Sequence, residues 1–92
     1  MIGLDARPRL ARKARLRHDR LTDRWLLIYP EAGLALSPTA AEVTRLCTGE
    51  RTVAAILDTL AASHAGAPRA TLQVDVLAFL DLLAARGLLQ AA

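Results

Sequence analysis

Few side chains in this 92-residue sequence could perform chemistry, and their spacing matches no catalytic or metal-binding pattern. Cys47 is the single cysteine, and it lies on an apolar helical stripe beside Leu46. A reactive thiol needs exposure and a nearby base or cation, so Cys47 is predicted to be a buried core residue. The two histidines, His18 and His64, lack HxxxH or CxxC spacing, which disfavours a metal site.

The carboxylates and glycines do not gather into a site either. The nine Asp and Glu residues are scattered, and no pair stands out as an acid/base couple. The five glycines are isolated, so no glycine-rich phosphate loop is present. We therefore expect no enzymatic activity, no cofactor and no metal.

The first part of the chain predicts three β-strands. The segment KARLRH, residues 13–18, alternates charged side chains with Ala, Leu and His, which is typical of a strand buried on one face. A second strand is expected over 24–29, and residues 25–29 are apolar at every position. Such a strand usually lies between neighbours and beneath a covering layer. After a turn over 30–33, a third strand is expected over 33–37, completing an antiparallel meander.

Three helices are expected to follow, over 38–48, 52–65 and 70–86. Ser37 is a suitable N-cap, and Pro38 suits the first helical position. The predicted fold class is α+β: a small, winged helix-turn-helix-like domain with a three-stranded antiparallel meander followed by a three-helix bundle. Residues 12–92 are expected to form this single domain. Residues 1–11 lack periodicity and are expected to be a mobile arm.

The charge is unevenly distributed. Residues 1–24 hold eight of the twelve Lys and Arg residues but only three of the nine acidic residues. Such a basic end is either a solvated face or a surface for an anionic partner. A winged-helix nucleic-acid-binding protein that uses this basic arm is the alternative function. The predicted helices over 52–65 and 70–86 expose almost no cation, which disfavours it.

The sequence also bears on cellular location. No apolar run is long enough for a transmembrane helix. The start MIGLDARPRL has charges where a signal peptide needs its apolar stretch, so we expect a cytoplasmic protein.

The two edges of the predicted meander differ. The first edge strand carries Lys13, Arg15 and Arg17, which guard against unwanted strand pairing, whereas residues 34–37 carry no charge. The predicted helix over 70–86 is apolar beyond one face, which is typical of a helix that is wedged between two surfaces or available to a partner. Together they suit an extended peptide that docks as an added strand. The arm, or a second copy in a strand-exchanged homodimer, are the other candidates to cover this edge.

The segment LALSPTAAEVTRLCTGERTVAAI, residues 34–56, resembles the PqqD family, which contains small proteins of pyrroloquinoline quinone (PQQ) biosynthesis. The preceding RWLLIYPEAG and RPRLARKARLRHD extend the resemblance, which covers residues 7–89. Thr48 stands where an acidic residue often precedes the glycine, and Ser37 stands where Asn is common. Both are cap or turn positions with tolerable substitutes.

The resemblance implies a peptide chaperone that binds a ribosomal precursor peptide and presents it to a radical S-adenosylmethionine (SAM) enzyme. Related recognition elements take the peptide as an added strand on their third strand, beside their third helix. By position, the implied peptide-binding residues are Leu34, Ala35, Leu36, Ser37, Val76, Leu77, Phe79, Leu80 and Leu83. A further hypothesis places enzyme docking on the basic strand, at Lys13, Arg15 and Arg17.

Overall fold

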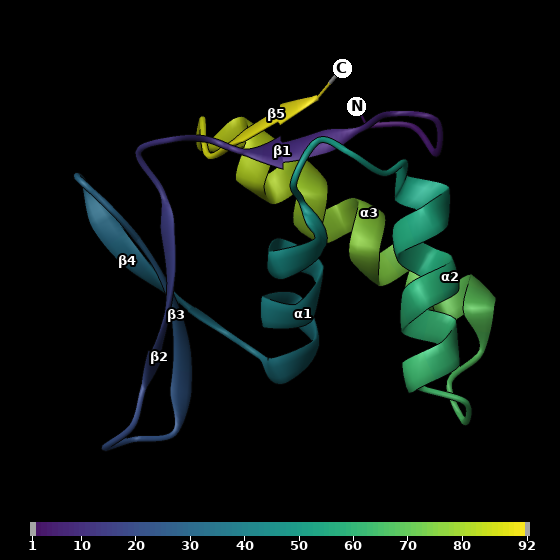
Figure 1. Ribbon diagram of the computed structural model, residues 1–92, viewed down its shortest axis with the longest axis horizontal. Helices are drawn as coiled ribbons and strands as arrows, with labels where there is room; N and C mark the ends of the chain where they lie inside the picture. The colour runs from purple at the N-terminus through teal and green to yellow at the C-terminus, as the bar shows by residue number, and fades with distance from the viewer. Residues whose placement is uncertain (1, 92) are drawn as a thin grey trace.

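The computed structural model describes residues 2–91 and arranges them as two small antiparallel sheets and three helices (Figure 1). Along the chain the elements are β1 (Pro8–Leu10), β2 (Arg15–Asp19), β3 (Arg24–Tyr29), β4 (Ala32–Leu36), α1 (Pro38–Leu46), α2 (Val53–Ser63), α3 (Arg69–Ala85) and β5 (Leu89–Ala91). One sheet has the order β2-β3-β4, and the other joins β1 to β5. In Figure 1, α1 lies between the three-stranded sheet and the α2–α3 pair.

The three-stranded sheet is the predicted meander, with β3 in its centre. Its register pairs Leu16 with Leu27 and Leu27 with Leu34, so these three side chains share one face. This inner face packs on the helices, and Leu27 is fully buried. Because side chains alternate along a strand, the intervening residues point to the opposite, outer face.

Sequence signals at the helix ends agree with the structure. Ser37 caps α1 by accepting a hydrogen bond from the Ala40 N–H at 3.1 Å, and Thr52 caps α2 through the Ala55 N–H at 3.1 Å. Pro38 occupies the start of α1. Gly49 follows α1 with a φ of +83°, a conformation that glycine adopts without strain.

The predicted mobile arm over 1–11 is wrong for the described residues 2–11, because they pack on the body of the protein. Pro8–Leu10 forms β1 and pairs antiparallel with β5. On its other side, β1 is tied to the end of α1: the Leu10 N–H donates to the Cys47 carbonyl at 3.0 Å, and the Gly49 N–H donates to the Pro8 carbonyl at 2.9 Å. Ile2 is also buried. The expected boundary before residue 12 is therefore not seen; Met1 and Ala92 lie outside the described residues.

One hydrophobic core joins the sheet to the helices. Four residues of α2 point into it, at Val53, Ile56, Leu57 and Leu60. From α3 come Leu72, Val76, Leu80 and Leu83. The predicted α+β class, with an antiparallel meander and three helices, is confirmed. The β1–β5 sheet is an addition, and the winged-helix likeness stays a prediction. Within residues 2–91, no helix is long and apolar enough to cross a membrane.

Candidate peptide-binding site

The strand β4 has one free edge. Within residues 2–91 it pairs with β3 alone. A two-residue turn separates Tyr29 from Ala32, and in such a hairpin this first cross-strand pair exchanges both backbone hydrogen bonds. The pattern then alternates, so the N–H and C=O groups of Gly33 and Ala35 point away from β3. These two residues therefore present four unpaired backbone groups at the sheet edge.

The side chains of β4 separate the core face from the outer face. Leu34 and Leu36 pair with Leu27 and Trp25 and lie on the inner face, where Leu36 is buried and Leu34 is half-buried. Ala35 is exposed on the outer face. An added strand would thus contact backbone groups at Gly33 and Ala35, while the side chains of Leu34 and Leu36 anchor β4 on the core.

A groove of about 500 Å³ begins where β4 ends. Ser37, the first residue after β4, is part of its wall. The groove runs between α1 and α3 and is mainly apolar. Its lining comprises Thr39, Ala40 and Val43 of α1, Leu72, Asp75, Val76 and Phe79 of α3, and His64 and Ala67 from the α2–α3 connection.

Polar groups lie at the groove end near α2. The His64 Nε2 atom is 3.0 Å from the Glu42 Oε1 atom, an interaction that links the end of α2 to α1. Asp75 is exposed and contributes a carboxylate to the lining. The groove therefore offers an apolar surface with an acidic margin, an arrangement that can bind a ligand with apolar side chains.

The structure brings together only some of the residues that the resemblance implies. Ser37, Val76 and Phe79 line the groove. Leu80 and Leu83 are fully buried in the core and have no surface for a docked peptide, so their assignment as peptide contacts is corrected. Leu77 is half-buried against the core and is not part of the lining.

Sequence reasoning missed the contribution of α1 to the groove, notably Thr39, Ala40 and Val43. The small side chain of Ala40, one turn after the Ser37 cap, was an available signal, because small residues leave room for a close neighbour. The contact of α1 with α3 across the groove could not be predicted, because the two helices are far apart in the sequence and no local pattern indicates that they meet.

The candidate nucleophile is inert in this environment. Cys47 is buried, and its Sγ donates a hydrogen bond to the Val43 carbonyl at 3.2 Å. Burial raises the pKa of the thiol to about 12, despite the opposing charge of Arg51. His18 and His64 lie apart, beside Asp23 and Glu42 respectively. Among the described residues, no group of three potential ligands could hold a metal ion.

The predicted docking residues Lys13, Arg15 and Arg17 divide between β2 and the turn before it. Lys13 precedes β2, and its Nζ forms an ion pair with Glu31 Oε1 at 3.2 Å. Arg15 and Arg17 pair with Ile28 and Leu26, which places both arginines on the outer face of the sheet.

An open strand edge that leads into an apolar groove defines a small binding domain. Comparison with known proteins gives the family: the model for "Coenzyme PQQ synthesis protein D (PqqD)" matches residues 24–89, and the chain belongs to the PqqD family. The fold is similar to the solution structure of the PqqD truncation of Methylobacterium extorquens PqqCD, described as a functional, stand-alone recognition element for ribosomally synthesised and modified peptides. The TM-score is 0.83 at 32% identity, over 98% of this chain and 95% of the other.

Curated relatives agree. The "PqqA binding protein" of Rhodopseudomonas palustris strain HaA2 is 46% identical over 96% of this chain and 85% of its own length. The "PqqA binding protein" of Bradyrhizobium diazoefficiens is 44% identical over 91% of this chain and 81% of its own length.

Proposed function

We propose that this protein is a peptide chaperone of PQQ biosynthesis, which binds the ribosomal precursor peptide PqqA and presents it to a radical SAM enzyme. In this role it performs no catalysis of its own and needs no cofactor. The names of its relatives and its similarity to a recognition element support the peptide as ligand. The mode of binding is β-strand addition to β4.

The observation that carries this proposal is the position of Ser37, which ends the free edge and begins the groove. A peptide paired with the backbone of Gly33 and Ala35 would continue past Ser37 to the mouth of the groove. Side chains of the peptide could then enter between α1 and α3, where Val76 and Phe79 lie.

The free energies involved indicate why peptide binding needs both the β4 edge and the groove. Four strand hydrogen bonds at about 1 kcal/mol each would roughly balance the ~2–5 kcal/mol cost of ordering a flexible peptide. Affinity must therefore come from apolar side chains that leave water for the groove, at ~25 cal/mol per Å² of buried apolar surface. Edge pairing sets direction and register, and the groove supplies binding energy and side-chain selection.

Titration of the labelled protein with synthetic PqqA, followed by NMR amide shifts, tests this function. The amides of 33–37 and of 72–79 should shift together and saturate at the same peptide concentration. A scrambled peptide of the same composition is the control. Saturable shifts that leave both segments unchanged would contradict the site, and the absence of any saturable shift would contradict peptide binding.

A further inference from the structure

Within residues 2–91, no layer covers the outer face of the three-stranded sheet, although its central strand is apolar on both sides. We define this outer sheet face by Arg15, Arg17, Leu26, Ile28 and Ala35, which the register places together. Antiparallel strands with one solvated face normally alternate apolar and polar residues. Here β3 instead presents Leu26 and Ile28 outward, and Ile28 remains 38% exposed.

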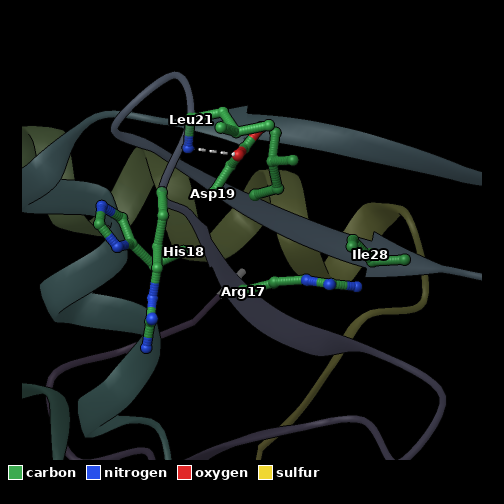
Figure 2. A pocket seen from close by; sticks show the side chains of 7 residues that line it. Arg17, His18, Asp19, Leu21 and Ile28 are labelled. Carbon is green, nitrogen blue, oxygen red and sulfur yellow. Dashed lines mark hydrogen bonds between the residues drawn. The ribbon is translucent and has the colours of Figure 1, made fainter.

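The β2–β3 turn extends this apolar surface. Leu21 projects from the turn and is 97% exposed. Together with Arg17, Leu26 and Ile28 it borders a shallow hollow of about 450 Å³. In Figure 2, the Arg17 side chain extends across the sheet toward Ile28, while the His18 side chain points away from Ile28. The hollow is thus lined by three apolar side chains, Leu21, Leu26 and Ile28, and by four polar or charged ones, Arg17, His18, Asp19 and Arg20.

The charge on this face is positive and largely uncompensated. The four ion pairs within residues 2–91 use Lys13, His18, His64 and Arg69, which leaves Arg15, Arg17, Arg20 and Arg24 without a carboxylate at ion-pair distance. Asp19 also lies on this face, where it accepts the Leu21 N–H at 3.0 Å, and its carboxylate offsets part of the charge of Arg17. That hydrogen bond favours the charged carboxylate and keeps the Asp19 pKa below its usual value.

We propose that the outer sheet face docks a protein whose own surface has an apolar centre bordered by Asp and Glu side chains. An apolar centre with a charged rim is the usual anatomy of a protein interface, and arginine is enriched there. Nucleic acid fits less well, because Trp25 and Tyr29 point to the inner face and leave no aromatic ring for base stacking. A second copy would bring like-charged arginines together.

This surface lies on the opposite side of the sheet from Leu34 and Leu36 and shares no residue with the groove lining. Ala35 belongs to both sites, but the proposed peptide pairs with its backbone at the sheet edge while its side chain points to the outer face, so peptide and protein partner can be bound at the same time. The identity of the partner rests on the proposed function: it is the radical SAM enzyme that receives the peptide.

The test measures binding of the purified radical SAM enzyme to immobilised wild-type protein and to three variants. Arg17→Glu and Ile28→Asp should each weaken the complex by about tenfold or more, because each places a carboxylate against the proposed acidic and apolar surface. Arg12→Glu is the matched control, because it makes the same charge change at an exposed residue outside this face. Binding of PqqA by each variant reports an intact fold and groove.

The outcomes separate the two proposals. Equal enzyme binding by wild type, Arg17→Glu and Ile28→Asp would overturn the docking face while leaving the proposed function intact. If wild type binds PqqA but not the enzyme, the proposed presentation of the peptide to the enzyme is contradicted. The proposal that this enzyme docks on the outer sheet face is then contradicted as well. A wild-type dimer in light scattering that Ile28→Asp disrupts would assign this face to self-association. Retention of a short DNA duplex that Arg17→Glu abolishes at physiological salt would assign it to nucleic acid.

Discussion

Arg86, at the end of α3, donates a hydrogen bond from Nη1 to the Tyr29 hydroxyl at the end of β3, with 3.2 Å between the two atoms. These residues are 57 positions apart, and their contact joins the β3–β4 hairpin to the helix that walls the groove. The neighbouring pair Lys13–Glu31 holds the turn of the same hairpin. The free edge of β4 is thereby positioned relative to α3 at the end remote from Ser37.

Tyr29→Phe tests this connection. The variant keeps the ring and loses the hydroxyl, so the free energy of unfolding should fall by about 0.5–1 kcal/mol, as expected for a single exposed hydrogen bond. Urea unfolding followed by circular dichroism measures the change. Arg86→Ala should produce a similar loss, and the double variant should lose less than the two losses combined. Strict additivity would show that the two groups do not interact.

Proline at position 35 tests strand addition. Ala35→Pro removes an N–H that points to the free edge of β4, and its ring obstructs an incoming strand, so PqqA binding should weaken by about tenfold or more. Helicity should be nearly unchanged, because edge strands tolerate proline where the N–H faces solvent. Calorimetry measures the affinity. Ala35→Val, which keeps the N–H, is the control and should bind PqqA within a few-fold of wild type.

Leu36→Pro gives the complementary result. The N–H of Leu36 faces Trp25 in the register derived above, so the variant breaks a bond within the sheet and should lower stability as well as binding. Wild-type affinity in Ala35→Pro would rule out pairing through residue 35.

Substitutions at two neighbouring residues of α3, Phe79 and Leu80, should distinguish the role of the groove from that of the core. Phe79→Ala removes a half-buried ring from the groove wall and should weaken PqqA binding by about tenfold. Leu80→Ala instead leaves a cavity at a fully buried position and should cost about 2–5 kcal/mol of stability. Thermal unfolding and calorimetry on both variants distinguish these effects. A Phe79→Ala protein that binds peptide like wild type would show that the ring takes no part.

Much of the meander and the helices could be predicted because their signals are local. Period-two alternation located β2, full apolarity located β3 as the central strand, and Ser37 with Pro38 located the start of α1. By contrast, β1 and β5 have three residues each and acquire strand structure only by pairing with each other, about 80 positions apart. No local pattern encodes such a contact.

The candidate site could be predicted only in part for a related reason. The family resemblance implied Val76, Phe79, Leu80 and Leu83 together as peptide contacts, but it could not say which of these side chains the other helices would cover. In the structure, Leu80 and Leu83 are fully buried in the core, whereas Val76 and Phe79 line the groove.

Deletion of residues 1–11 tests whether the first segment belongs to the fold. The deletion removes β1 and the buried Ile2 and Pro8, and it exposes apolar side chains such as Leu88 and Leu89. The truncated protein should have a lower Tm by at least about 10 °C or fail to fold cooperatively. A control that replaces only the exposed Leu4 and Asp5 with Ser should keep wild-type stability. A deletion variant with unchanged Tm would restore the mobile-arm interpretation.

The buried thiol of Cys47 should make stability depend on alkaline pH. Its pKa rises from the ordinary 9.0 to about 12 in the folded protein, so the unfolded chain loses this proton at lower pH than the folded chain. The stabilisation is therefore complete below about pH 9 and is lost as the pH rises toward about 12, at roughly 1 kcal/mol per pH unit. Urea unfolding of wild type and Cys47→Ala across this range isolates the thiol from the tyrosine and lysine groups that both proteins share. The difference in unfolding free energy between them should change with pH by this amount, and native wild type should resist alkylation at pH 8 until it unfolds. A pH-independent difference together with rapid native alkylation would show that the thiol is accessible.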